Sequence, residues 1–77
     1  MKIQILGTGC AKCQNLAKMA EDTAKSQGLI YELEKITDME QIMAFGVMRT
    51  PALAIDGVVK LSGRLPTADE LKQILTQ

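Results

Sequence analysis

Residues 1–13 read MKIQILGTGCAKC, and this stretch contains both cysteines of the chain. Ile3 and Ile5 alternate with polar neighbours, which is the pattern of a half-buried β-strand. Residues 7–9, Gly-Thr-Gly, predict a tight loop, and Cys10 stands where that loop meets the next element. The opening of the chain therefore predicts a strand that leads directly into two cysteines at C-x-x-C spacing.

The segment after Cys10 has the pattern of an amphipathic helix followed by a strand. Apolar residues recur at helical spacing over residues 11–27, and Gly28 stands where a left-handed C-cap is needed. Residues 29–36 mix β-branched, aromatic and charged side chains, which predicts a second, partly exposed strand. Because a helix of crossover length joins them, we expect the first two strands to lie parallel.

A second helix is expected next. Residues 37–40, Thr-Asp-Met-Glu, form a capping box, which predicts a helix of about two to three turns that ends before Gly46. Residues 47–50 are expected to be extended, because Pro51 disfavours the helical conformation for the residue before it. The chain then enters its third strand with a proline at the first residue.

The last third of the chain predicts a hairpin and a terminal helix. Asp56-Gly57 lies between the apolar runs 52–55 and 58–61, and this is a strong signal for an antiparallel hairpin. Thr67 and Glu70 form another capping box, and an apolar stripe follows it. The predicted element order is therefore βαβαββα.

This order predicts an α/β fold with a four-stranded mixed sheet flanked by three helices that cover both of its faces. The 77 residues contain no linker, repeat or low-complexity segment, so we expect a single domain over residues 1–77. A domain of this size has only a marginal core, so most apolar side chains must be used for packing.

Composition argues against several classes of partner. The charges of nine basic and nine acidic residues cancel, and the residues are interspersed along the chain. The chain therefore has no positive electrostatic potential that would attract nucleic acid or anionic lipid. Tyr31 and Phe45 are the only aromatic residues, which leaves no stacking platform for bases. The apolar stretch in residues 1–6 is too short for a secretory leader or a membrane span. We therefore expect a cytoplasmic monomer without nucleic-acid or membrane partners.

The cysteine pair Cys10-Ala11-Lys12-Cys13 is the candidate reactive site. In a reducing cytosol two cysteines at this spacing indicate redox chemistry or metal binding rather than a structural disulfide. Unpaired N–H groups and the helix dipole favour a thiolate at Cys10, which is the expected attacking group, and Cys13 is one turn inside as the resolving thiol. Lys12 either adds positive charge near the thiolate or is simply solvated.

No cofactor or metal is required by this chemistry. The chain has no histidine, and a single C-x-x-C pair cannot complete a zinc site within one chain. We therefore expect a redox-active Cys10–Cys13 disulfide as the working group, with a disulfide substrate and a separate, unidentified reductase as partners.

Together with Thr50-Pro51 before the third strand, these features make the chain resemble the thioredoxin superfamily. The early start at the strand before Cys10 is similar to the short glutaredoxin-like core, and residues 7–13 resemble the small thioredoxin-like redox-active disulfide proteins. The resemblance covers nearly the whole chain and implies a thiol–disulfide oxidoreductase, a thioredoxin/glutaredoxin-like protein-disulfide reductase, on a thioredoxin-like fold.

The resemblance also implies roles for individual residues. Cys10 matches the nucleophilic cysteine, Cys13 the resolving cysteine, and Pro51 a cis-proline that packs beside them. Thr50 would offer backbone groups to an extended substrate chain. Lys12, Gly9 and Gly63 are expected to shape the active site around the two cysteines.

The chain departs from that family in three ways. No tryptophan precedes Cys10, and residues 62–64 lack the Gly-Gly-x-Asp signature of glutathione binding, so glutathione use is not expected. The buried acidic residue that assists the resolving cysteine in thioredoxins also has no counterpart, because Glu21 and Asp22 lie well beyond Cys13.

Two other functions remain open from the sequence. A heavy-metal module that binds Cu(I) through two thiolates has a similar loop, although its fold runs βαββαβ and ends on a strand. A redox-sensing interaction protein would use the disulfide only to bind or release a partner. Met19, Met39, Met43 and Met48 could bind soft metals, but we expect them to fill gaps in the core instead.

Overall fold

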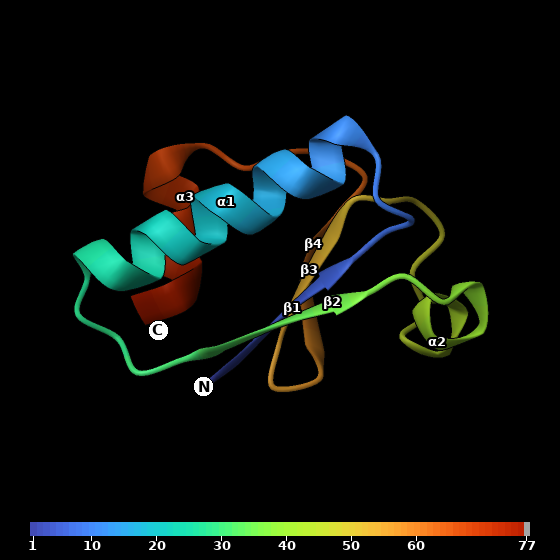
Figure 1. The fold of residues 1–77 in the computed structure, drawn as a ribbon, viewed down its shortest axis with the longest axis horizontal. Coiled ribbons are helices and arrows are strands. Elements are labelled where there is room, and N and C mark those ends of the chain that lie inside the picture. Colours follow the sequence, from blue (N-terminus) through green and yellow to red (C-terminus); the bar gives the residue numbers. More distant parts are fainter. Residues whose placement is uncertain (77) are drawn as a thin grey trace.

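A computed structural model describes residues 1–76, and Gln77, the last residue of the predicted domain, lies outside the described residues. The elements follow the predicted order (Figure 1): β1 Lys2–Leu6, α1 Ala11–Ser26, β2 Glu32–Ile36, α2 Met39–Ala44, β3 Ala52–Ile55, β4 Val58–Ser62 and α3 Ala68–Thr76. The α/β class and the βαβαββα order are therefore confirmed. Within residues 1–76, no helix has both the length and the apolarity needed to cross a membrane.

The four strands form one mixed sheet in the order β2-β1-β3-β4. β1 runs parallel to β2 and antiparallel to β3, and β3 pairs with β4 through the hairpin. The hairpin turn is the predicted Asp-Gly pair, with positive φ at Asp56 (51°) and Gly57 (87°), as a two-residue turn of this type requires. β1 is therefore an inner strand. The cysteine loop follows its C-terminal end, so it lies near the middle of that end of the sheet.

Alternation along the inner strands creates two apolar layers. Ile3, Ile5 and Leu53 face one side of the sheet, where α1 and α3 cover them. Leu6 and Ala52 face the other side, where α2 lies (Figure 1). Successive strand residues point to opposite faces, so both faces of the sheet are apolar and need cover. The prediction that helices cover both faces is confirmed.

The helix ends are mostly as predicted. α1 ends one residue before the predicted Gln27, and Gly28 adopts the left-handed conformation (φ 68°) expected after a helix. At the start of α3 the Glu70 N–H donates to Thr67 Oγ1 at 3.1 Å, and the Thr67 N–H donates to the Glu70 carboxylate at 3.4 Å. This reciprocal pair is the predicted capping box.

The start of β2 and the length of α2 differ from the prediction. β2 begins at Glu32 rather than at residue 29, and Ile30 is 92% exposed because it lies before the strand joins the sheet. α2 spans only six residues, and its N-cap is Asp38 rather than Thr37. The Asp38 carboxylate accepts a hydrogen bond from the Gln41 N–H at 3.2 Å, so it satisfies an unpaired donor in the first turn of the helix, one residue later than predicted.

The predicted core role of the methionines is wrong for three of the four. Met19 packs against the α1 face of the core, as expected. Met39, Met43 and Met48 are instead 56%, 67% and 95% exposed. The short α2 meets the sheet through Ile42, which is buried, so its remaining apolar side chains face solvent.

Replacing each of the two candidate N-cap residues of α2 with alanine tests which of them caps the helix. Asp38→Ala is expected to lower the free energy of unfolding by about 1 kcal/mol, because it removes the acceptor for an unpaired helix N–H. Thr37→Ala is the matched control and should change it much less. Urea denaturation of both variants measures this difference, and a larger loss for Thr37→Ala would contradict the assignment.

Candidate active site

Cys10 occupies the N-cap of α1. Its backbone is extended (φ −68°, ψ 167°), so the chain leaves the loop after β1 and turns into the helix at this residue. The Cys13 N–H donates to Cys10 Sγ at 3.4 Å, and the sulfur thus takes the position that a serine or aspartate oxygen takes in an ordinary cap. The cysteine side chain is exposed, so a disulfide can reach it from solvent.

Cys13 lies one turn further along α1 and is only 5% exposed. Its sulfur is 2.7 Å from that of Cys10, longer than a disulfide bond of about 2.05 Å. Both residues are free thiols in this structure. One sulfur therefore meets solvent while the other is held directly behind it, and little movement is needed to join them.

The pKa values of the two thiols are shifted in opposite directions. The pKa of Cys10 is lowered, first by the hydrogen bond that the Cys13 thiol donates to it and then by the Cys13 backbone N–H. The pKa of Cys13 is raised, first by burial and then by its role as the donor in that hydrogen bond. Desolvation disfavours a charged sulfur and hydrogen-bond donors favour it, so the negative charge of the pair is placed on Cys10.

Gly7 makes room for the Cys13 sulfur, a role in the site that its place in a predicted tight loop does not reveal. A Cβ at this position would lie 2.2 Å from Cys13 Sγ and 3.2 Å from Cys13 Cβ. Contact this close requires the neighbouring atoms to move. Gly7 does not have the positive φ that marks Gly9, so space rather than backbone conformation is the reason for a glycine here.

Thr50 and Pro51 approach the cysteines from the segment before β3. The Thr50–Pro51 peptide is cis, as the resemblance implied, and Pro51 is fully buried. The Cβ of Thr50 is 3.8 Å from the position that a Gly7 Cβ would take, which places this segment beside the Cys13 sulfur. Gly63 donates its N–H to the Pro51 carbonyl at 2.8 Å and so ties the loop after β4 to the same corner.

Gly9 and Lys12 lie next to the cysteines without contacting a reacting group through a side chain. Gly9 has a φ of 91°, which explains the glycine, and its carbonyl accepts a hydrogen bond from Gln14 Nε2 at 3.1 Å. The Lys12 side chain is exposed and takes part in none of the ion pairs within residues 1–76. The solvated alternative for Lys12 therefore describes this structure.

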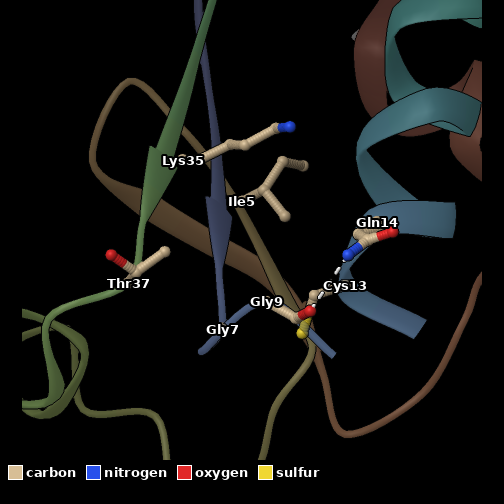
Figure 2. Close-up of a pocket in the computed structure, with 7 residues that line it drawn as sticks. All are labelled: Ile5, Gly7, Gly9, Cys13, Gln14, Lys35 and Thr37. Carbon is tan, nitrogen blue, oxygen red and sulfur yellow. Dashed lines mark hydrogen bonds between the residues drawn. The ribbon is translucent and has the colours of Figure 1, made fainter. Parts of the chain in front are cut away.

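A pocket of about 290 Å³ lies beside Cys13 between α1 and the sheet. Figure 2 shows Lys35 and Thr37 on the β2 side of it, Gln14 on the helix side, and Ile5 between Lys35 and Cys13. The pocket is lined by Ile5, Gly7, Gly9, Cys13, Gln14, Lys35 and Thr37. None of these lining residues is a carboxylate.

These features define a class of protein. A dithiol begins a helix on a four-stranded mixed sheet, with one sulfur exposed and one buried, and a cis-proline segment closes the corner beside them. This is the arrangement of a thiol–disulfide oxidoreductase of the thioredoxin fold, and it is not the βαββαβ order of the heavy-metal modules, because the described chain ends on α3.

Comparison with known proteins agrees with this class. The family model described as "Thioredoxin domain" matches residues 1–76. The chain is 49% identical over 76 residues to a thioredoxin of Methanothermobacter thermautotrophicus, covering 99% of each protein. It is 34% identical over 73 residues to a thioredoxin of Methanocaldococcus jannaschii, covering 95% of this chain and 84% of the relative. The chain belongs to the thioredoxin family, and its function is thiol–disulfide oxidoreduction.

Proposed function

We propose that Cys10 is the nucleophile of this oxidoreductase and that Cys13 is its resolving cysteine. The observation that carries this assignment is the opposite environment of two sulfurs only 2.7 Å apart. Cys10 is exposed and accepts hydrogen bonds, whereas Cys13 is buried and donates one. A thiolate must reach the substrate, so the exposed sulfur of lower pKa attacks first.

The proposed reaction has two exchange steps. The Cys10 thiolate attacks one sulfur of a substrate disulfide, a Cys10–substrate disulfide forms, and the other substrate sulfur leaves as a thiolate and takes up a proton. Cys13 then loses its proton and attacks Cys10 Sγ, which releases the second substrate thiol. The protein dithiol is oxidised by two electrons to the Cys10–Cys13 disulfide, and the substrate disulfide is reduced to two thiols.

Thr50 and Pro51 are proposed to receive the substrate chain beside Cys10. Within residues 1–76, neither the N–H nor the carbonyl of Thr50 pairs with another backbone group, and the β1–β3 ladder begins only at Ala52. These free groups can pair with an extended segment that carries the substrate disulfide. Gly63 is proposed to hold Pro51 in place through the hydrogen bond to its carbonyl.

The partners of the protein are, in general terms, disulfide substrates and a reductase. We further propose that the protein works as a monomer in the cytoplasm, where a reductase returns the Cys10–Cys13 disulfide to the dithiol. The redox-active disulfide is proposed to be the only group that the reaction needs. The absence of a glutathione signature supports a separate reductase as the electron donor.

The pH dependence of alkylation at each cysteine tests the two roles. Because the pKa of Cys10 is lowered, its reaction with iodoacetamide is expected to persist to a lower pH than that of an ordinary thiol. Because the pKa of Cys13 is raised, that thiol is expected to react only at higher pH. Mass spectrometry of the separate peptides measures the two midpoints in the reduced protein.

The unfolded protein in denaturant is the control for this experiment, because both thiols should then titrate alike near about 8.5. The same single midpoint in the folded protein would contradict the assignment of nucleophile and resolver. A lower midpoint at Cys13 than at Cys10 would reverse it.

A further inference from the structure

Lys35 is a charged residue at the end of an otherwise apolar row along β2. Tyr31, just before the strand, and Leu33 occupy the preceding alternate positions and pack against the core that α1 covers. Lys35 pairs in register with Ile5, whose side chain belongs to that same core, so the lysine stands on the α1 face of the sheet. It lies at the end of β2 nearest the cysteines, where core packing does not account for a charge.

Lys35 lines the pocket of about 290 Å³ beside the buried Cys13. Figure 2 shows its side chain extending from β2 toward α1, across Ile5. Among the residues that line this pocket, only Lys35 and Cys13 are ionisable. The buried sulfur and the lysine therefore share one partly enclosed space between the helix and the sheet.

The positive charge of Lys35 is not neutralised by its neighbours on β2. Over residues 1–76, it takes part in none of the ion pairs. Glu34 lies on the opposite face of the sheet, where its carboxylate is 3.8 Å from Lys2 Nζ and accepts a hydrogen bond from Gln4. The other charged groups near the cysteines lie outside the pocket lining: Lys12 on α1, Arg49 before β3, and the Arg64–Glu70 pair after β4.

The second exchange step places a negative charge on Cys13. Its thiol must lose a proton before it attacks Cys10 Sγ, and burial raises the pKa of this thiol. In the reduced protein the charge on Cys10 also opposes ionisation of Cys13, but that charge is gone once Cys10 is in a mixed disulfide. Burial then remains as the main obstacle, and a positive charge beside the pocket reduces it.

We propose that Lys35 promotes the second exchange step by stabilising the Cys13 thiolate across this pocket. The inference rests on the proposed function, because it takes Cys13 to be the resolving cysteine. Lys35 is exposed, and its flexible stem lets the ammonium turn toward the sulfur as charge develops there. It acts through Cys13 and does not touch the substrate.

The step balances without a further reactant. The Cys13 proton passes to a base in the solvent, the Cys13 sulfur forms a bond to Cys10 Sγ, and the Cys10–substrate bond breaks. The electron pair of that bond leaves on the substrate sulfur, which takes up a proton. Lys35 keeps its own proton throughout, so its role is electrostatic.

A charge series at position 35 tests this role on the second step. The parent, Lys35→Arg, Lys35→Met and Lys35→Glu are mixed with a peptide disulfide at a concentration that makes adduct formation fast. Acid quenching and intact mass spectrometry follow the decay of the Cys10–peptide adduct. Lys35→Arg should resolve it at the parent rate, Lys35→Met about two- to threefold more slowly, and Lys35→Glu about three- to tenfold more slowly. Adduct formation should change by less than about twofold, because Cys10 is exposed and outside the pocket lining.

The titration of Cys13 gives a second readout. In a Cys10→Ser background position 10 is neutral, as it is in the mixed disulfide, and the ¹³Cβ chemical shift of Cys13 reports its midpoint. Lys35→Met should raise this midpoint by about 0.5–1 pH unit and Lys35→Glu by about 1–2, whereas Lys35→Arg should leave it unchanged. Because the pKa is raised, the loss of rate should be largest below the parent midpoint and shrink above it. High salt should also reduce the differences.

Lys60→Met is the matched control. It removes an exposed lysine from β4, the other edge strand of the sheet, and should resolve the adduct at the parent rate. Equal resolution rates and midpoints across the charge series would overturn the proposal, and so would a Lys35→Arg variant as slow as Lys35→Met or an equal loss in Lys60→Met. Failure of the parent to form a Cys10 adduct, or an adduct that decays equally fast without Cys13, would instead overturn the proposed function itself.

Discussion

Cys13→Ser is expected to stop turnover and to leave the protein covalently joined to its substrate through Cys10. The serine hydroxyl can still donate a hydrogen bond to Cys10, so the first attack should proceed at a rate close to that of the parent. It cannot act as the second sulfur, and the mixed disulfide therefore has no internal route to resolution. Intact mass spectrometry after mixing with a peptide disulfide should show the protein plus one peptide half.

Two further variants make this result specific. Cys13→Ala removes the hydrogen-bond donor as well as the sulfur, so the pKa of Cys10 should rise and the first attack should be slower than in Cys13→Ser. Cys10→Ser should form no adduct, because Cys13 is buried. An adduct that persists in Cys10→Ser, at Cys13, would mean that the order of the two cysteines is the reverse of the one proposed.

Gly7→Ala is the second change with a large expected effect. The new methyl group would lie 2.2 Å from Cys13 Sγ, so the sulfur must move away from its position beside Cys10. We expect a loss of about 1–3 kcal/mol in the free energy of unfolding of the reduced protein, as is usual for overpacking. The pKa of Cys10 should also rise, because the thiol that donates to it is displaced.

A double-mutant cycle separates this effect from a general loss of stability. In the Cys13→Ala background the sulfur is absent, and Gly7→Ala should cost much less than in the parent. We expect a coupling energy of at least about 1 kcal/mol between the two positions from urea denaturation under reducing conditions. Equal costs in both backgrounds would show that Gly7 is needed for a reason other than the sulfur.

The order of the elements was predictable because local signals mark nearly every boundary. The Asp56-Gly57 turn, the Thr67 capping box and Gly28 each act within a few residues, and the structure places all three as predicted. The start of β2 and the N-cap of α2 were not predictable in the same way. Thr37 and Asp38 are both good N-cap residues, and the choice between them depends on how the chain packs against the sheet. Local propensity carries no information about that packing.

The reactive pair was predictable from its spacing, whereas its surroundings were not. Gly7 was missed because a glycine after a strand indicates a turn, and only the position of a sulfur six residues later reveals the need for space. The three exposed methionines were assigned to the core because the sequence does not tell which apolar residues of a six-residue helix are left over. Each of these errors concerns how side chains of different elements pack, or fail to pack, against each other, and not the local backbone conformation.

The separation of the cysteines on α1 from the methionines on α2 and its following segment has a consequence for divergence within the family. The exposed positions 39, 43 and 48 are held by little packing, so substitutions there should cost little stability. These three surface positions are therefore free to change among relatives at little cost to the fold. Throughout that change, the Cys10–Cys13 pair and the glycine that makes room for it would stay the same.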